Sequence, residues 1–228
     1  MINMKIKDFN HTLGYGIYTI PDAAFILGLP ASKVRRWMNE FWDQRIGKEI
    51  DERYSWGEGR DKATNFYTLI EFYVFYQLRE MNISTKKILS VHKEMREMLD
   101  TPYPFASAKV LTDGKSILFK MEDETIVHAD RSRQIALKEI IESFCKKIEF
   151  SSSDMADRFY PIGKDKHIIV DPHHQFGQPI IEDTSILAET VYDFYKAGET
   201  VQFLIKLYNL SEVEVMDAIA LFEPGEAA

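Results

Sequence analysis

The chain has 228 residues, of which 45% are hydrophobic and 28% charged. This length accommodates one large domain or two to three small ones, and the apolar content excludes an intrinsically disordered chain. A single cysteine, Cys145, excludes an internal disulfide framework and a zinc site built from several cysteines. No apolar run approaches the ~20 residues that a membrane-spanning helix needs, and the N-terminus has no signal-peptide pattern. We therefore expect a cytoplasmic protein without a membrane segment.

The formal net charge of -8 is unevenly distributed along the chain. Residues 1–60 carry a net charge of +1 and residues 61–150 a net charge of 0, whereas residues 151–228 carry -9. An acidic C-terminal region repels phosphates, so it is a poor surface for nucleic acid. It favours either a basic protein partner or a simple role in solubility.

A helix-turn-helix is predicted over residues 19–37. The first helix begins at Thr19, whose hydroxyl caps it, and Asp22 completes a capping-box pattern. Gly28 supplies the left-handed residue that ends this helix, and Pro30 starts the second one. A short helix, a tight turn containing glycine and a polar second helix are typical of modules that enter the major groove of DNA.

The second helix has an apolar side and a polar, basic side. Val34, Trp37 and Met38 recur at the spacing of one helix face and are predicted to pack against the first helix. The predicted DNA-binding residues are Ser32, Lys33, Arg35, Arg36 and Asn39. Arginine hydrogen-bonds guanine and phosphate, and asparagine hydrogen-bonds adenine. Because neighbouring helix positions point about 100° apart, one arginine is expected to read bases and the other to hold phosphate. The alternative is a solvated basic face.

Residues 51–65 are rich in glycine and charge and are predicted to form a loop, with a wing beside the helix-turn-helix as one interpretation. Two helices follow within residues 66–99, and Ser84 is predicted to cap the second of them. The aromatic residues 72–76 of the first helix are interpreted as core. The apolar stripe of the second helix consists of Ile88, Val91, Met95 and Met98.

The periodicity changes after residue 100. A Thr112-Asp-Gly-Lys turn between short apolar runs predicts a hairpin within a small β-meander, and residues 135–148 predict a helix. Residues 151–154, Ser-Ser-Ser-Asp, are the predicted domain boundary. Beyond them we expect a short strand at residues 167–170 and then three helices. The first spans residues 185–195, the second begins at about residue 200, and the third follows Ser211. Their acidic surface favours protein binding.

The fold class predicted from these elements is α+β and mainly α-helical. It combines an N-terminal helix-turn-helix module, a small β-meander in the middle and a C-terminal three-helix domain. The expected domains are residues 1–100 for DNA binding, residues 101–150 for the meander and its helix, and residues 151–228 for the acidic helical domain.

Metal or catalytic chemistry is not expected. The one cluster of metal-ligand residue types, formed by His167, Asp171, His173 and His174, is interpreted as a surface turn because no second cluster supports it. The chain also contains none of the common phosphate-loop, nucleophile-elbow or zinc-protease motifs. We therefore predict a protein that is not an enzyme, with no catalytic residues, no cofactor and no metal.

Two portions resemble known families. Residues 17–99 resemble the DNA-binding head of MerR-type regulators, through Leu27-Gly-Leu-Pro-Ala-Ser-Lys-Val-Arg-Arg-Trp and Leu78-Arg-Glu-Met-Asn-Ile-Ser. Residues 167–222 resemble the antitoxin-associated domain of unknown function 433, through Ile169-Val-Asp-Pro and Phe176-Gly-Gln-Pro-Ile-Ile. The combination is similar to VapB-type antitoxins, whose partners are PIN-like ribonucleases. The chain departs from the domain's usual Gly-Thr-Arg, because Asp183-Thr-Ser stands there and the glycine and arginine are absent.

The resemblance implies an antitoxin of a type II toxin-antitoxin system. Such a protein would neutralise a PIN-like ribonuclease toxin through its C-terminal domain and repress its own operon as a homodimer on operator DNA. Two alternatives stay open. One is a one-component regulator whose residues 72–76 bind a small ligand, and the other is a non-catalytic interaction adaptor.

Overall fold

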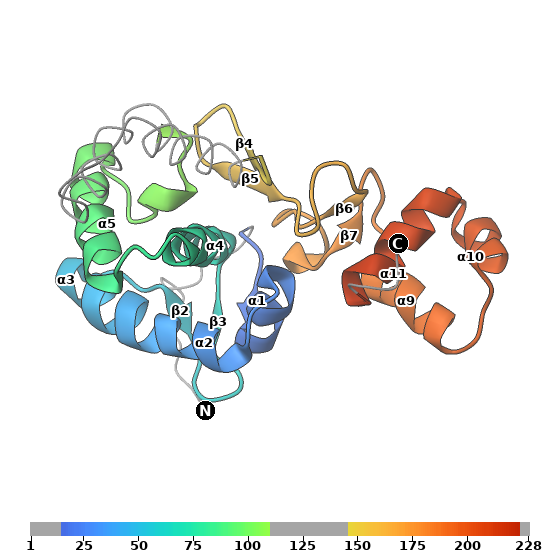
Figure 1. Ribbon diagram of the computed structural model, residues 1–228, viewed down its shortest axis with the longest axis horizontal. Helices are drawn as coiled ribbons and strands as arrows, with labels where there is room; N and C mark the ends of the chain where they lie inside the picture. Colours follow the sequence, from blue (N-terminus) through green and yellow to red (C-terminus); the bar gives the residue numbers. More distant parts are fainter. Residues whose placement is uncertain (1–14, 110–145, 224–228) are drawn as a thin grey trace. The chain divides into compact units, whose positions relative to one another are not determined.

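The computed structural model describes residues 15–109 and 146–223 of the chain (Figure 1). These residues combine helices with small sheets, in agreement with the predicted mixed and mainly helical class. The chain divides into two compact units. Among the described residues, 18–109 and 146–157 belong to the larger unit, and 15–17 and 158–223 belong to the smaller one. None of the helices in the described ranges is long and apolar enough to cross a membrane.

The larger unit begins with β1 (Tyr18–Thr19), α1 (Ile20–Leu27) and α2 (Ala31–Arg36). The Thr19 hydroxyl accepts a hydrogen bond from the Asp22 backbone N–H, and the Asp22 carboxylate accepts one from the Thr19 N–H at 2.9 Å. Gly28 ends α1 in the left-handed conformation, with φ of 64°. The predicted capping box and glycine stop are thus confirmed.

The second helix is longer and less regular than the sequence predicted. α2 continues without a break into the π-helix η2 (Trp37–Gly47) and then into α3 (Lys48–Ile50). In a π-helix each N–H bonds the carbonyl five residues earlier, a geometry that is rare over more than one turn. Trp37, Met38 and Trp42 are buried along this helix. The aromatic packing therefore stabilises a helical geometry that local propensity alone does not favour.

A small antiparallel sheet follows in strand order β1-β3-β2. The hairpin strands β2 (Ser55–Trp56) and β3 (Ala63–Thr64) pair with each other, and β3 also pairs with β1. Thr64 lies opposite Tyr18 on one side and Ser55 on the other. Residues 55–64 of the stretch predicted as a loop therefore form a hairpin with residues 57–62 at its tip, whereas residues 51–54 are irregular as predicted.

The helices α4 (Phe66–Glu80) and α5 (Thr85–Leu99) complete the core of this unit, with the short 3-10 helix η3 (Pro104–Ala106) against them. Phe72, Tyr73 and Phe75 are buried, so their interpretation as core is confirmed, whereas Tyr76 is half-buried. The aromatic side chains on which the ligand-sensing alternative rested are thus largely core residues. Ser84 caps α5 as predicted.

The apolar stripe predicted for α5 is wrong at one residue. Met98 is 45% exposed, whereas Ile88, Val91 and Met95 are buried as expected. The buried stripe instead includes the polar residues His92 and Arg96. The spacing of apolar residues could not predict that His92 and Arg96 are buried, because their burial depends on polar partners from other elements.

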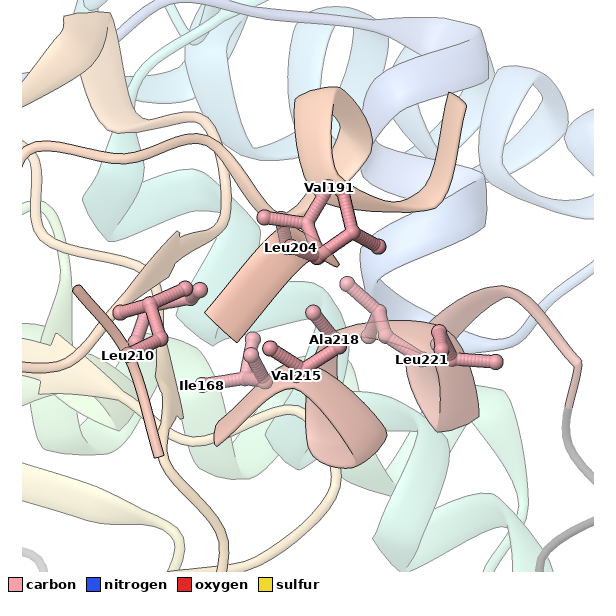
Figure 2. Close-up of a cluster of buried hydrophobic side chains, with 10 residues drawn as sticks. Ile168, Val191, Leu204, Leu210, Val215, Ala218 and Leu221 are labelled. Carbon is pink, nitrogen blue, oxygen red and sulfur yellow. The ribbon is translucent and has the colours of Figure 1, made fainter. Parts of the chain in front are cut away.

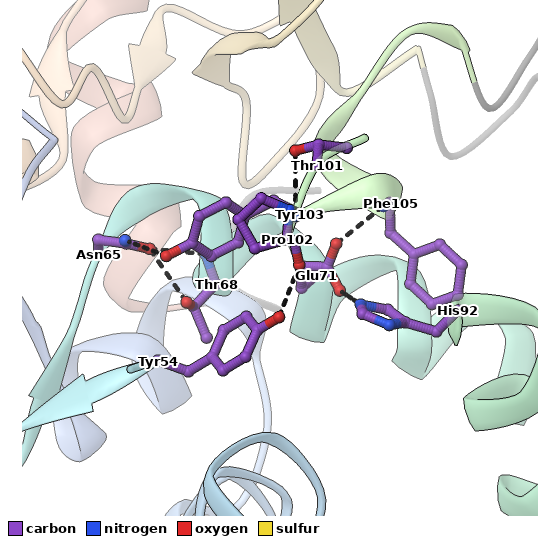
Figure 3. Close-up of polar contacts among 9 residues, drawn as sticks. All are labelled: Tyr54, Asn65, Thr68, Glu71, His92, Thr101, Pro102, Tyr103 and Phe105. Atoms are coloured by element: carbon purple, nitrogen blue, oxygen red, sulfur yellow. Dashed lines mark hydrogen bonds and ion pairs between the residues drawn. The ribbon is translucent and has the colours of Figure 1, made fainter. Parts of the chain in front are cut away.

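Those partners form a buried polar network that joins α4, α5 and η3 (Figure 3). Glu71 Oε2 lies 2.6 Å from Nε2 of His92, and Glu71 Oε1 accepts a hydrogen bond of 2.8 Å from the Phe105 N–H. Nearby, the Tyr54 hydroxyl donates to the Pro102 carbonyl at 2.7 Å. Burial raises the pKa of Tyr54 well above its usual value and that of Tyr103 to about 12, so both hydroxyls stay protonated.

Part of the middle segment lies outside the described residues, including the Thr112-Asp-Gly-Lys hairpin, Cys145 and most of the helix predicted over residues 135–148. The end of that predicted helix is wrong, because Ile148 begins the strand β4 (Ile148–Phe150). β4 pairs with β5 (Ala156–Phe159). Residues 151–154 form the turn between them, since the Ser151 N–H bonds the Met155 carbonyl at 2.8 Å. The division between the two units falls after Asp157.

The smaller unit combines two short strands with three helices, and its main apolar core is shown in Figure 2. Its elements are β6 (Ile168–Ile169), η4 (Gln175–Gly177), β7 (Ile180–Ile181), α9 (Ala188–Lys196), α10 (Val201–Tyr208) and α11 (Glu212–Phe222). Side chains from all three helices meet Ile168 in this core, including Val191, Leu204 and Val215. Burial of each such side chain stabilises the fold by about 1.5–3 kcal/mol before entropic costs.

The junctions between these helices follow the sequence signals. Gly198 adopts φ of 102° after α9, and the Thr200 side chain caps α10. Ser211 and Glu214 form a capping box at the start of α11. α9 begins at Ala188 rather than at the predicted Ser185, because the backbone before it pairs with β7, where the Ile181 N–H bonds the Ile186 carbonyl at 2.9 Å.

Replacing Glu71 by alanine is expected to destabilise the larger unit by about 3 kcal/mol. The substitution leaves the Phe105 N–H and His92 without their acceptor in a buried environment. Urea unfolding followed by far-UV circular dichroism measures the change. The control, Glu97→Ala, removes an exposed carboxylate from α5 and is expected to change stability by no more than about 0.5 kcal/mol. Equal effects of the two substitutions would contradict the structural role of the network.

Candidate nucleic-acid interface

The outer side of the continuous helix formed by α2 and the start of η2 presents four of the five predicted DNA-binding residues together. Val34 and Trp37 are buried on the inner side, which fixes the rotation of the helix. Four exposed residues at positions i, i+3, i+4 and i+7 form what we term the α2 face: Ser32, Arg35, Arg36 and Asn39. Residues at this spacing lie one above the other on a helix. A single surface of the helix therefore carries two guanidinium groups, a hydroxyl and an amide.

Lys33, the fifth predicted residue, lies beside this face in a different environment. It is half-buried, and its ammonium group lies over two rings, 5.9 Å from the Trp37 ring centre and 5.2 Å from that of Tyr76. A lysine over aromatic rings keeps its charge while its stem packs on apolar surface. Lys33 thus contributes positive charge at the edge of the α2 face while its stem joins α2 to α4.

The hairpin loop of residues 57–62 lies against the α2 face. Gly57 and Gly59 have φ of 76° and 60°, and a Cβ at Gly57 would approach the Asp61 carbonyl oxygen to 2.5 Å. The tight turn therefore requires glycine at this position. The loop reaches the helix at two points, because Arg35 Nη1 donates to the Gly59 carbonyl at 3.5 Å and Lys62 Nζ donates to Asn39 Oδ1 at 2.5 Å.

These contacts enclose a groove of about 260 Å³ between helix and loop, lined by Ile20, Arg35, Asn39, Gly57, Glu58, Gly59 and Lys62. Lys62 also forms an ion pair of 2.7 Å with Asp43, which accepts a hydrogen bond from the Ser55 hydroxyl at 2.8 Å. Asn39 therefore joins a polar chain that ties the hairpin to the helix. The amide oxygen of Asn39 positions the loop. The sequence predicted only that Asn39 hydrogen-bonds adenine, and it did not indicate this structural contact.

The charge of this surface is concentrated in a few arginines. Arg36 and Arg60 are exposed, and neither forms an ion pair within the described parts of the chain. Three exposed carboxylates, Glu40, Glu58 and Asp61, moderate the positive potential. Arg60 is far from α2 in sequence, but it lies in the hairpin loop next to Gly59. The Gly59 carbonyl accepts a hydrogen bond from Arg35. Sequence reasoning missed Arg60 and Lys62 as members of the surface, although the Gly-Glu-Gly-Arg spacing marks the exposed turn that carries them.

The chemistry available here is recognition rather than reaction. Guanidinium groups on a helix, next to a glycine-rich hairpin, donate paired hydrogen bonds to phosphates or to base edges. An exposed helix flanked by such a loop has the dimensions to approach a nucleic-acid groove.

The histidine cluster of the smaller unit separates into two carboxylate-centred groups. His167 Nδ1 lies 2.8 Å from Asp217 Oδ2, whereas His174 Nδ1 lies 3.0 Å from Asp171 Oδ2. Asp171 also accepts the His173 backbone N–H at 2.8 Å, which fixes a turn. Within residues 15–109 and 146–223, no group of three or more histidine, cysteine or carboxylate side chains is placed to hold a metal ion.

Asp217 is a buried carboxylate that the sequence prediction did not single out. It accepts hydrogen bonds from the His167 backbone at 3.1 Å and side chain, and it forms an ion pair of 3.1 Å with Lys166. Burial acts to raise the pKa of Asp217, but the hydrogen bonds from His167 and the charge of Lys166 outweigh it and lower the pKa below its usual value. Asp217 therefore anchors α11 to the segment that enters β6.

Comparison with known proteins places these units in context. Residues 168–221 match the family model of the protein of unknown function DUF433. The chain is 23% identical over 227 residues to the Mycobacterium tuberculosis protein named "Putative antitoxin VapB45", covering 89% of this chain and 92% of that protein. Its fold is similar to the crystal structure of Rv2018 from Mycobacterium tuberculosis, with a TM-score of 0.70 and 21% identity over 89% of this chain and 96% of the other.

The contribution of Asp217 to stability is expected to depend on pH. Because the pKa of Asp217 is lower in the folded than in the unfolded state, the stabilisation is present above about pH 4 and is lost as the pH falls through the folded pKa. Asp217→Asn is expected to cost about 1–3 kcal/mol at pH 7 and less as the pH falls below 4. Thermal unfolding of both proteins across this pH range measures the difference. A cost of the substitution that grew on acidification would contradict the assignment.

Proposed function

We propose that this protein is an antitoxin of a type II toxin-antitoxin system that acts in the cytoplasm. It binds a PIN-like ribonuclease toxin through its smaller, acidic unit and represses its own operon through the α2 face of its larger unit. The observation that carries the proposal is the similarity, over 89% of this chain, to a Mycobacterium tuberculosis protein named as an antitoxin. Its role is binding, without catalytic activity, cofactor or metal.

The DNA-binding part of the proposal is supported by the geometry of α1, α2 and the hairpin. In this interpretation α1 and α2 act as a MerR-like helix-turn-helix, and the loop of residues 57–62 acts as a wing. Arg35 and Arg36 lie next to each other on the exposed helix, so one contacts base edges while the other contacts phosphate. Operator DNA is bound by a homodimer, because a two-fold protein matches two half-sites.

The toxin-binding part is supported by the match of residues 168–221 to the domain of unknown function and by charge. Residues 151–228 carry five Lys/Arg against fourteen Asp/Glu, a composition that repels nucleic acid. A ribonuclease presents basic side chains to its RNA substrate, so an acidic unit is complementary to it. The complex blocks the metal-dependent active site of the toxin.

Co-expression with the product of the neighbouring gene tests the proposal as a whole. The full-length chain carries an affinity tag, and the neighbouring product is also expressed alone. We expect the product alone to arrest growth and to degrade RNA, and we expect the chain to restore growth and to co-purify with it. A neighbouring product that is harmless and does not co-purify would refute the antitoxin assignment.

Arg36→Ala is expected to weaken binding to the protein's own promoter about tenfold while leaving partner binding unchanged, because it removes one exposed guanidinium. Loss of a phosphate contact also reduces the slope of log affinity against log salt by about 1. Fluorescence anisotropy with labelled promoter DNA at several salt concentrations measures both quantities, and Arg35→Ala is compared in parallel.

The matched control for these substitutions is Arg45→Ala. Arg45 is an exposed arginine of the same continuous helix that lines a different cavity, next to α5 residues such as Lys86 and Leu89. It is expected to leave promoter affinity unchanged. Equal weakening by all three substitutions, or none by any of them, would contradict the assignment of the α2 face.

A further inference from the structure

A small pocket in the larger unit gathers positive charge. It has a volume of about 200 Å³ and lies between α5 and the last part of the continuous helix that α2, η2 and α3 form. Four cationic side chains and one carboxylate line this pocket, a net charge of +3 within a chain whose net charge is -8. We term it the α5 pocket, and its charged residues are Arg45, Glu49, Lys86, Lys93 and Arg96.

The walls of the α5 pocket come from two helices, and each wall supplies cations. Arg45 is exposed near the end of η2, and its guanidinium lies 5.5 Å from the centre of the Phe41 ring, which supports it from one side. On α5, Lys86, Ser90 and Lys93 recur at positions i, i+4 and i+7, so they share one side of that helix. Folding therefore brings positive charges from separate helices to one small space.

Glu49 neutralises only part of this charge. It forms an ion pair with Lys93, and its Oε2 atom lies 3.7 Å from Arg96 Nη2. The hydrogen bond from Lys93 lowers the pKa of Glu49 below its usual value, so the carboxylate is ionised at neutral pH. Arg45 and Lys86 form no ion pair within residues 15–109 and 146–223. Because like charges held close together repel, the pocket favours a further anion.

Two buried residues that line the pocket carry polar atoms without a hydrogen-bond partner. His92 is fully buried, and Arg96 is only 8% exposed. His92 Nε2 contacts Glu71 (Figure 3), whereas His92 Nδ1 and Arg96 Nη1 have no partner within the described parts of the chain. Buried polar atoms are seldom left unpaired in native proteins, and such atoms indicate a bound water molecule, ion or ligand. This observation is independent of the charge of the pocket, and a buried guanidinium requires acceptors.

The carboxylates of a neighbouring hollow do not cancel the charge of the α5 pocket. Glu52, Glu97 and Asp100 line that hollow, which shares only Glu49 and Arg96 with the α5 pocket. All three carboxylates are exposed, so water and salt screen them. Arg45, Lys86 and Lys93 do not line the hollow, and the excess of positive charge therefore belongs to the α5 pocket.

The size and charge of the pocket select the chemistry of the anion. Its volume is below the roughly 300–1,000 Å³ of sites that enclose a whole drug-sized ligand, so it encloses a short group. A carboxylate carries a single negative charge, whereas a phosphate monoester carries about -1.5 to -2. Guanidinium groups donate paired hydrogen bonds to phosphate, and ammonium groups bind it as point charges. Two linked phosphates match a net charge of +3 better than one carboxylate or one phosphate does.

We propose that the α5 pocket binds the diphosphate group of a small phosphorylated molecule. Arg45 and Lys86 hold the phosphates from the two walls, and the buried Arg96 supplies a guanidinium between them and the core. The backbone of duplex DNA fits this pocket less well, because exposed side chains make such contacts whereas two residues of the pocket are buried. This site is separate from the α2 face and does not depend on the proposed antitoxin function.

The test measures binding of inorganic pyrophosphate to the full-length chain by isothermal titration calorimetry at constant ionic strength. Wild type is compared with the double variant Arg45→Gln/Lys86→Gln, which removes the two unpaired cations of the pocket. We expect this variant to bind pyrophosphate about tenfold more weakly or worse, because it loses two charge-assisted contacts. The matched control, Lys48→Gln/Lys206→Gln, removes two exposed lysines that do not line the pocket and is expected to leave the affinity unchanged.

Thermal unfolding supplies a second readout and shows that each variant is folded. Pyrophosphate at a hundredfold excess over its Kd is expected to raise the Tm of wild type by about 5 °C. The pocket variant is expected to unfold cooperatively without ligand and to show little of this shift. Citrate at the same ionic strength tests whether several carboxylates replace the phosphates, and we expect it to bind about tenfold more weakly than pyrophosphate.

Four outcomes would overturn the proposal. Pyrophosphate does not bind wild type, or the pocket variant and the control variant lose affinity equally, which would mean general attraction to positive charge. Citrate binds as tightly as pyrophosphate, in which case the pocket does not select phosphates. The pocket variant weakens promoter binding as strongly as Arg36→Ala does, in which case its cations hold the phosphate backbone of DNA. None of these outcomes bears on whether the chain binds the product of the neighbouring gene.

Discussion

The packing of Trp37 against α4 is the contact on which the arrangement of the larger unit depends. Its ring meets Phe75 edge-on at 4.9 Å and Phe72 at 6.2 Å, at the point where α2 passes into the π-helix. A helix held by a buried tryptophan cannot rotate about its axis without losing several kcal/mol of burial. The opposite side of α2, with Arg35 and Arg36, is therefore committed to solvent, and the hairpin loop is held beside it through Asn39.

Under the proposed function, the two units offer surfaces of different charge to two kinds of partner. In the larger unit, the α2 face and the hairpin loop carry exposed guanidinium groups that are suited to binding phosphate. In the smaller unit, exposed carboxylates lie beside exposed aromatic side chains. Positive groups attract nucleic acid and negative groups repel it, so each surface discourages the partner of the other. This division reconciles the net charge of -8 with the proposed DNA binding, because the net negative charge is confined to residues 151–228.

Local signals were sufficient to predict the parts of the fold that depend on a few neighbouring residues. The capping box at Thr19, the cap at Ser211 and the glycine stops at Gly28 and Gly198 are all present, because each is a contact within one turn of chain. The π-helix, the burial of His92 and the exposure of Met98 were missed, since each depends on side chains far away in sequence, such as Glu71. Helix periodicity alone was sufficient to predict the four residues of the α2 face. The position of Lys33 over two aromatic rings, the Asn39–Lys62 contact and the contribution of Arg60 depend on other elements and were not predicted.

Hydrogen exchange of the full-length chain tests most directly whether the protein has two separate binding surfaces. It is measured with promoter DNA and, separately, with the purified product of the neighbouring gene. We expect DNA to slow exchange in residues 31–39 and 57–62 and to leave residues 168–221 unchanged, whereas the product of the neighbouring gene protects residues within 168–221 and leaves α2 unchanged. Protection of the same segment by both ligands, or protection of α9 and α10 by DNA, would contradict it.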